Sequence, residues 1–132
     1  MKNCKFVSVG MLLLVTGALA GPTQDEAPRP AARDATPTEI ELIRDALQMK
    51  LKDADSAKFR SVRIIDPAVG SPYGDVCGDL SSKNGYGAYV GFTRFFTRFE
   101  VKPDGKRVFQ TPILDDARVK LATIICSHYV LT

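Results

Sequence analysis

Few side chains in this sequence have the types and spacing that catalysis needs. Small secreted ribonucleases can combine a carboxylate base, a histidine acid and arginines that hold phosphate, and Glu100, His128, Arg94 and Arg98 are of those types. However, the only histidine lies among apolar residues, where a packing role is more common, and no serine-hydrolase motif is present. We therefore predict no catalytic residue, and a phosphodiester hydrolase using Glu100 and His128 is the alternative.

A second set of residues favours binding over catalysis. Arg94, Phe96 and Arg98 share one face of a predicted strand, and Tyr86 and Tyr89 precede them in a glycine-rich stretch. The glycines lead into a strand and not into a helix, so they indicate bends more than a phosphate cradle. These five residues are our candidate ligand or partner surface, and the protein is predicted to be a non-enzymatic binding or inhibitor-type module.

The two arginines suggest what this surface would attract. With Lys106 or Arg107 of the following strand, Arg94 and Arg98 could form a shallow patch for anions. The alternative is a solvated sheet face on which arginine stems cover aromatic rings. The predicted partner is an unidentified envelope or extracellular protein. No nucleic acid is expected, because the charge outside the export segment is close to balanced.

Three cysteines raise the question of a disulfide or a metal site. Cys4 lies in the predicted export segment, which leaves Cys77 and Cys126 as an even pair in an oxidising compartment. This predicts a Cys77–Cys126 disulfide, with two buried free thiols as the alternative. A zinc site is less favoured, since His128 is the only further soft ligand and no CxxC pair exists. We expect no metal and no cofactor.

The first 20 of the 132 residues are predicted to be a signal peptide. Lys2 and Lys5 form a basic start, an apolar run follows, and Ala18-Leu19-Ala20 provides a small-x-small cleavage site. The run is short for a membrane span, which needs roughly 20 residues, so an uncleaved anchor is the alternative. The mature protein is expected to be periplasmic or secreted, without a transmembrane segment.

The rest of the chain divides into a tether and one domain. Residues 21–35 contain three prolines and almost no large apolar side chain, so they are predicted to be a disordered Pro-rich tether. Residues 36–132 are long enough for a single small domain. Two of the 18 basic side chains lie in the signal peptide, so the remainder nearly balances the 15 acidic ones.

The pattern within the domain predicts an α+β fold. A capping box at Thr36-Pro37-Thr38-Glu39 opens a helix that should end near Asp53 and pack on the sheet through an apolar stripe. Strand-like runs at 59–65, 76–80, 86–101 and 106–113 predict about four short antiparallel strands. In the first run, Phe59 is predicted to share a face with Ser61. Residues 116–127 are predicted to form a terminal helix, with a strand as the alternative, tied to the sheet by the disulfide.

Two segments resemble a group of small exported bacterial proteins. Residues 55–60, Asp-Ser-Ala-Lys-Phe-Arg, are similar to their D-SA-FR segment, and residues 76–92 to their VCG-VN-KN--GGY-G--RF segment. Leu80-Ser81 stands where Val-Asn is usual, and Gly87-Ala88 where Gly-Gly is usual. The resemblance covers less than half of the chain, and it implies export and an α+β domain but no catalytic residue.

Overall fold

The computed structural model describes Gly17, Gly21 and residues 31–129. Apart from the two glycines, the predicted signal peptide and residues 22–30 of the predicted tether lie outside the described residues. The described chain is α+β, as predicted. Its strands all pair in antiparallel fashion, and there are six of them instead of about four. In chain order the elements are β1 (Ala32–Asp34), α1 (Pro37–Ala46), the 3₁₀ turn η1 (Ala54–Ser56), β2 (Lys58–Ile65), β3 (Tyr73–Ser81), β4 (Thr93–Val101), β5 (Arg107–Phe109), β6 (Ile113–Leu114) and α2 (Leu121–Cys126).

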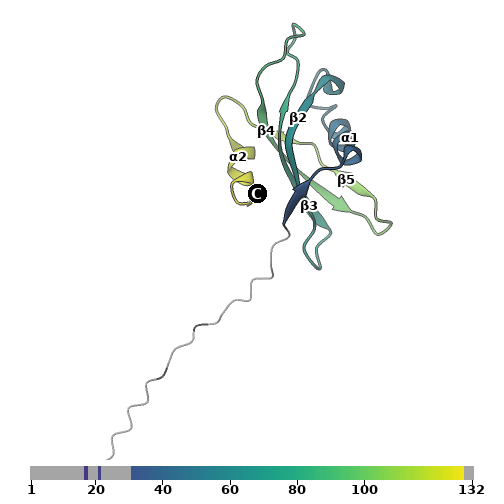
Figure 1. The fold of residues 1–132 in the computed structure, drawn as a ribbon, viewed down its shortest axis with the longest axis vertical. Coiled ribbons are helices and arrows are strands. Elements are labelled where there is room, and N and C mark those ends of the chain that lie inside the picture. The colour runs from purple at the N-terminus through teal and green to yellow at the C-terminus, as the bar shows by residue number, and fades with distance from the viewer. Residues whose placement is uncertain (1–16, 18–20, 22–30, 130–132) are drawn as a thin grey trace, which may run out of the picture.

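The sheet separates two apolar clusters, and one helix covers each of its faces (Figure 1). The strand order is β1-β2-β3-β4-β5, with β6 also paired to β4. The smaller cluster joins Cys77 and Phe96 to Ala122 and Cys126 under α2. The larger cluster lies under α1 and consists of Ile43, Leu47, Ala54, Val62, Ile64, Val76, Leu80, Phe95 and Phe99.

The first helix begins where the sequence predicts it to begin. Thr36 is the N-cap, its hydroxyl accepts from the Glu39 backbone N–H at 3.2 Å, and the Glu39 carboxylate accepts from the Thr36 N–H at 2.9 Å. Pro37 occupies the first turn, where its missing N–H is not needed. The capping box is therefore confirmed.

The predicted end of this helix near Asp53 is wrong, because α1 ends at Ala46. The Arg44 guanidinium donates to three backbone carbonyls at 2.8–3.0 Å, and these belong to the segment that leads into β2. A helix that continued to residue 53 would carry that segment away from Arg44. The carbonyls belong to Ala54, Asp55 and Ala57.

Strand β2 contains a β-bulge that the sequence pattern does not reveal. Its register with β3 shifts between Arg60 and Arg63, and Ser61 has a positive φ of 51°. The bulge turns Phe59 to the same face as Val62, so Phe59 packs on the α1 cluster and meets the Phe95 ring edge-on at 5.9 Å. The predicted regular alternation, with Phe59 beside Ser61, is therefore wrong.

Four charged side chains join the two outer strands of the sheet. Arg33 of β1 donates to the carboxylates of Glu39 and Asp66, and Arg107 of β5 donates to the same two carboxylates. These contacts span 2.5–3.1 Å, and Glu39 is only 6% exposed. We call these four side chains the ion ring. The ring places β1 in the fold, so residues 32–34 belong to the sheet and not to the predicted tether.

The ion ring makes stability depend on acid pH. Hydrogen bonds from Arg33 hold the pKa of both Glu39 and Asp66 below their ordinary values of 4.5 and 3.8. A carboxylate with a lowered folded pKa stabilises the fold above its unfolded pKa and stops doing so as pH falls through the folded pKa. We therefore expect the free energy of unfolding to be level from neutral pH to about pH 5 and to fall steeply below about pH 4.

A glutamine at position 39 tests this expectation. Glu39→Gln should lower the free energy of unfolding at pH 7 by about 2 kcal/mol and flatten its decline in acid, because the charged hydrogen bonds are weakened. Glu41→Gln is the matched control on the same helix, since the Glu41 side chain is 67% exposed and should change stability by less than about 0.5 kcal/mol. Urea unfolding of the three proteins at several pH values would contradict the role of the ring if their acid profiles were parallel.

The terminal segment is a helix and not a strand, but it is shorter than the predicted span of residues 116–127. The helix α2 covers Leu121–Cys126 and is held at its start by Asp115, which accepts from the Thr123 N–H at 3.2 Å and from the Thr123 hydroxyl. The disulfide between Cys77 and Cys126 is present, as predicted, and fixes α2 to the central strand β3. Neither of the described α-helices is long and apolar enough to cross a membrane.

Candidate functional site

The structure does not bring the candidate acid and base into one cavity. The Glu100 carboxylate on β4 accepts from the Lys102 ammonium at 2.6 Å. His128 is exposed and follows α2 in the chain, and its Nδ1 donates to the Ile124 carbonyl at 2.9 Å. Neither residue lines any of the cavities described below. Each side chain is thus engaged with its own neighbourhood in the chain.

The two candidate arginines of β4 lie on one face, as predicted, and both bind aspartates of β3. Arg98 donates to both carboxylate oxygens of Asp75 at 2.7 and 3.1 Å, and these hydrogen bonds raise the pKa of Arg98. The Tyr129 hydroxyl also donates to Asp75. Burial, followed by this hydrogen bond, raises the pKa of Tyr129 to about 12. Arg98 is therefore part of a structural contact between the sheet and the end of the chain.

Arg94 is the less exposed of the two, with 31% of its side chain accessible against 47% for Arg98. Its Nε lies 3.1 Å from the Asp79 carboxylate, which also lies 3.4 Å from the Arg60 guanidinium. The predicted partner Arg107 lies elsewhere, because it belongs to the ion ring and contacts the Phe99 ring in the α1 cluster. Arg107 is therefore not part of the predicted anion patch of Arg94 and Arg98.

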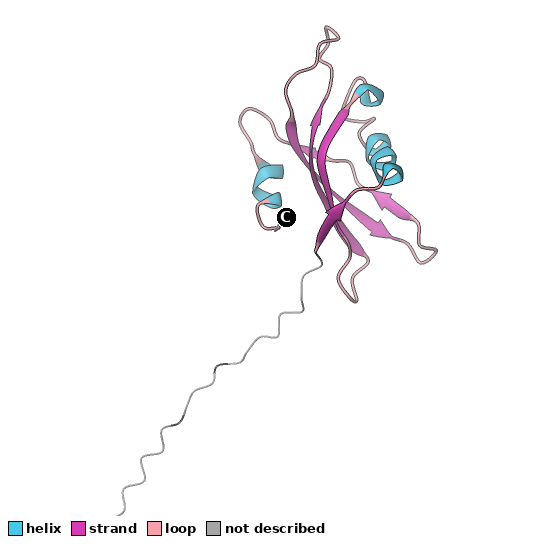
Figure 2. Ribbon diagram, in the orientation of Figure 1, coloured by secondary structure: helices cyan, strands magenta, loops and turns pink. Residues whose placement is uncertain are grey.

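The predicted aromatic residues occupy two very different places. Phe96 is 8% exposed and packs under α2, so it contributes to the core and not to a surface. Tyr86 is 97% exposed at the connection between β3 and β4, which extends beyond the end of the sheet (Figure 2). Tyr89 is partly exposed on the same connection, and its hydroxyl donates to the Ser56 carbonyl at 2.9 Å.

The β3–β4 connection, residues 82–92, presents an unusual concentration of exposed apolar side chains, and its backbone is held in shape. The Asn84 side-chain oxygen accepts from the N–H groups of Tyr86 and Ala88, and Lys83 forms a β-bridge with Tyr89. We call this connection the aromatic hairpin. Its exposed apolar side chains are Tyr86, Tyr89, Val90 and Phe92.

Cations lie against two of these rings. The Lys58 ammonium is 4.0 Å from the centre of the Tyr89 ring, with that of Lys83 at 5.6 Å, and the Arg60 guanidinium is 3.9 Å from the centre of the Phe92 ring. Such cation–π contacts hold long side chains in place over the rings. The result is a surface that is apolar at its tip and positive at its base.

Two cavities share Arg60, whose guanidinium stacks on Phe92 of the aromatic hairpin. The first, of about 560 Å³, lies between the hairpin base and the start of α2 and contains Arg94, Asp79 and Lys120. Its charges are mixed, because Asp115 and Asp116 face the same space. The second, of about 570 Å³, lies between β2 and α1, and we call it the edge pocket.

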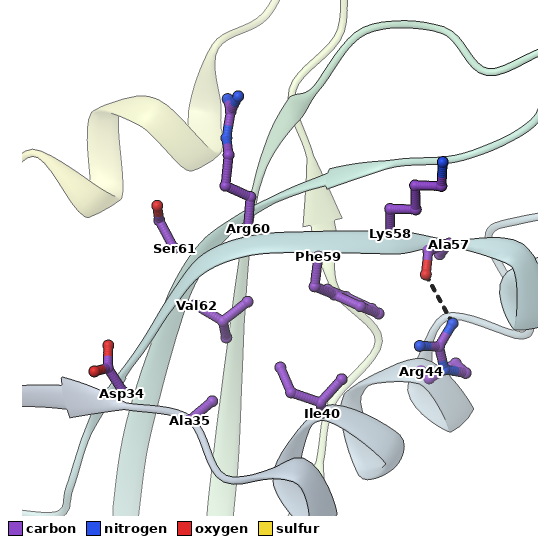
Figure 3. A pocket seen from close by; sticks show the side chains of 10 residues that line it. All are labelled: Asp34, Ala35, Ile40, Arg44, Ala57, Lys58, Phe59, Arg60, Ser61 and Val62. Atoms are coloured by element: carbon purple, nitrogen blue, oxygen red, sulfur yellow. Dashed lines mark hydrogen bonds between the residues drawn. The ribbon is translucent and has the colours of Figure 1, made fainter.

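The edge pocket has an apolar side and a polar side (Figure 3). Phe59 and Val62 of β2 point toward Ile40 of α1 across the opening, whereas Lys58 and Arg60 point to the other side of β2. The Arg44 guanidinium closes one end by donating to the Ala57 carbonyl at 2.8 Å. The pocket is therefore a slot along the strand, closed at one end by Arg44.

Within residues 31–129, no group of three or more His, Cys, Asp or Glu side chains could hold a metal ion. Sequence reasoning missed the edge pocket, since it depends on where β1 stops alongside β2. It also missed the stacking of Lys58 and Arg60 on Tyr89 and Phe92 of the aromatic hairpin. The only signal in the sequence was that basic residues precede β3 and aromatic residues follow it.

Comparison with known proteins identifies no related protein. No protein-family model matches the chain, and neither a curated protein nor a solved structure matches it. The resemblance to small exported bacterial proteins therefore stays a prediction.

Proposed function

We propose that this protein is an exported, non-enzymatic module that binds another protein through the aromatic hairpin and the cations at its base. The periplasm or the extracellular space would be its site of action. The disulfide supports that location, because such bonds persist in oxidising compartments. The observation that carries the binding role is the exposure of four apolar side chains on one ordered hairpin.

The composition of this surface is that of an interaction site. Aromatic residues and arginine are enriched in protein interfaces, and a few of them supply most of the binding free energy. Tyr86 exposes almost its whole side chain and has no apolar partner within the described chain that explains its presence at the tip. The neighbouring Lys58, Lys83 and Arg60 favour a partner with acidic groups around an apolar centre.

The geometry gives no comparable support to a phosphodiester hydrolase. Glu100 is bound by Lys102, His128 is bound to its own helix, and the two share no cavity. Arg98, which would hold the phosphate, is occupied by Asp75. RNA cleavage by the purified protein that disappears in both Glu100→Gln and His128→Ala would nevertheless overturn the binding proposal.

Capture experiments test the hairpin directly. We expect the immobilised protein to retain a partner from an envelope extract, and the double variant Tyr86→Ser/Phe92→Ser to retain at least tenfold less of it. Retention should also fall when salt is raised from about 0.1 to 1 M, which shortens the screening length from about 10 to 3 Å. The melting temperature of the variant should change little, since surface substitutions usually alter stability by less than about 0.5 kcal/mol.

Val108→Ser provides the matched control. Val108 is exposed to the same degree as Phe92, at 43%, but lies on β5. Equal capture by the wild type and the hairpin variant, or an equal loss in Val108→Ser, would show that the hairpin is not the binding surface.

A further inference from the structure

Part of strand β2 has a partner on one side only. β1 pairs with residues 63–65 of β2, and the Ala35 N–H reaches the Val62 carbonyl at 3.1 Å before the chain turns into α1. Residues 58–61 of β2 therefore have no strand beside them on the side away from β3, within the described chain. An open strand edge offers backbone N–H and C=O groups to an added strand.

This open edge coincides with the edge pocket. Phe59 and Ile40 point into the slot between β2 and α1, and Lys58 and Arg60 lie on the opposite side of the same stretch of backbone (Figure 3). Side chains of an added strand alternate between these two sides. Every second side chain would therefore enter an apolar slot, and those between would face cations.

We propose that β2 accepts an extended peptide segment of the partner at residues 58–61, and that this segment alternates apolar and acidic side chains. The proposal rests on the proposed binding function and specifies what the module recognises. The apolar side chains would contact Ile40 and Phe59, and the acidic ones Lys58 and Arg60. Strand addition of this kind gains affinity from backbone hydrogen bonds and specificity from alternate side-chain pockets.

The edge is prepared for this role. The hydrogen bond from Arg44 to the Ala57 carbonyl fixes the start of the open stretch, and the bulge at Ser61 fixes its end. The Arg60 guanidinium is held over the Phe92 ring, and the Lys58 ammonium over the Tyr89 ring. Binding would therefore order few additional side chains, which lowers its entropic cost.

Two other occupants fit less well. A second copy pairing through the same edge would bring Lys58 and Arg60 against their own counterparts, and like charges opposite one another destabilise a strand pair. The described chain enters β1 at Ala32, which pairs with Ile65 at the opposite end of β2 from residues 58–61. A partner segment with acidic side chains avoids the repulsion between like charges and can lie beside residues 58–61.

Synthetic peptides test the proposal. The probe is a capped peptide of alternating glutamate and valine, seven residues long, titrated into the ¹⁵N-labelled protein. We expect shifted amide signals and slowed hydrogen exchange for residues 58–61, with a Kd of about 1 mM or tighter. The same peptide with N-methylated valines should bind at least tenfold more weakly, because it cannot donate the backbone hydrogen bonds. Shifts confined to other residues, or none at several millimolar peptide, would overturn strand addition.

A charge exchange sharpens the test. Lys58→Glu should weaken the glutamate–valine peptide at least tenfold and strengthen a lysine–valine peptide, whereas Lys106→Glu, in the turn before β5, should leave both unchanged. An unaltered peptide preference in Lys58→Glu would overturn the proposal. Failure of the peptides while Tyr86→Ser/Phe92→Ser still abolishes partner capture would remove strand addition and leave the binding module intact; capture that survives in that variant would remove the hairpin module instead.

Discussion

Reduction of the Cys77–Cys126 disulfide is expected to lower the free energy of unfolding by about 4 kcal/mol. The bond closes a loop with a sequence separation of 49 residues. Opening such a loop raises the entropy of the unfolded chain, and in the chain-entropy model this lowers the free energy of the unfolded state by about 4 kcal/mol. Single domains are commonly stable by only about 5–15 kcal/mol, so the loss is a large fraction of the total. Urea unfolding with and without reductant should show a midpoint lower by roughly 1–4 M in the reduced protein.

The terminal helix should feel this loss first. α2 has only six residues, which is too short for a helix to be stable without tertiary contacts. In the reduced protein, the amides of α2 should exchange with solvent faster than those of β3 and β4. The Cys77→Ala/Cys126→Ala variant should behave like the reduced protein and be insensitive to reductant. A difference of less than about 1 kcal/mol between oxidised and reduced protein would show that packing alone holds α2.

Among glycine-to-alanine substitutions, Gly74→Ala is expected to be the most destabilising and to lower the free energy of unfolding by about 3 kcal/mol. Gly74 of β3 lies directly opposite Phe99 of β4. A Cβ at this position would be 2.2 Å from the Phe99 Cζ and 2.8 Å from the Ile65 carbonyl oxygen. Phe99 is fully buried, so its ring cannot move aside without displacing the α1 cluster.

Two controls are a smaller side chain at position 99 and a glycine that has open space around it. Phe99→Leu should be less costly in the Gly74→Ala background than in the wild type, with a coupling of about 1 kcal/mol or more in a double-mutant cycle. Gly91→Ala adds the same methyl group where no atom lies within 4 Å, and it should change stability by less than about 1 kcal/mol. Equal effects at positions 74 and 91 would contradict the steric explanation.

The features that the sequence predicts correctly depend on short-range or pairwise signals. The capping box is complete within four residues, and the disulfide follows once Cys4 is assigned to the export segment. The strand registers are different. The bulge at Ser61 depends on the residues that β2 meets across the sheet, and serine carries no local signal for a positive φ.

Long-range contacts also explain what the sequence hides about the edges and the site. β1 consists of Ala-Arg-Asp, which has no preference for strands, and the ion ring is what holds it in place. The exposed tyrosines of the aromatic hairpin could be predicted, because the turn residues around them are local. The edge pocket could not, since it exists only where β1 ends and β2 continues.

The ion ring also sets an order on how the chain can fold as it is made. Arg33, Glu39 and Asp66 emerge early, but their second guanidinium, Arg107, follows Glu39 by 68 residues. Until then, the two carboxylates share a single cation, and the curved sheet has only one of its outer strands. A nascent chain therefore cannot complete the ion ring until about four fifths of it has been synthesised, and contacts of such long separation slow the final closure. For the exported protein that we propose, the ion ring would stay incomplete during most of synthesis, when a chain that has to cross a membrane channel must remain unfolded.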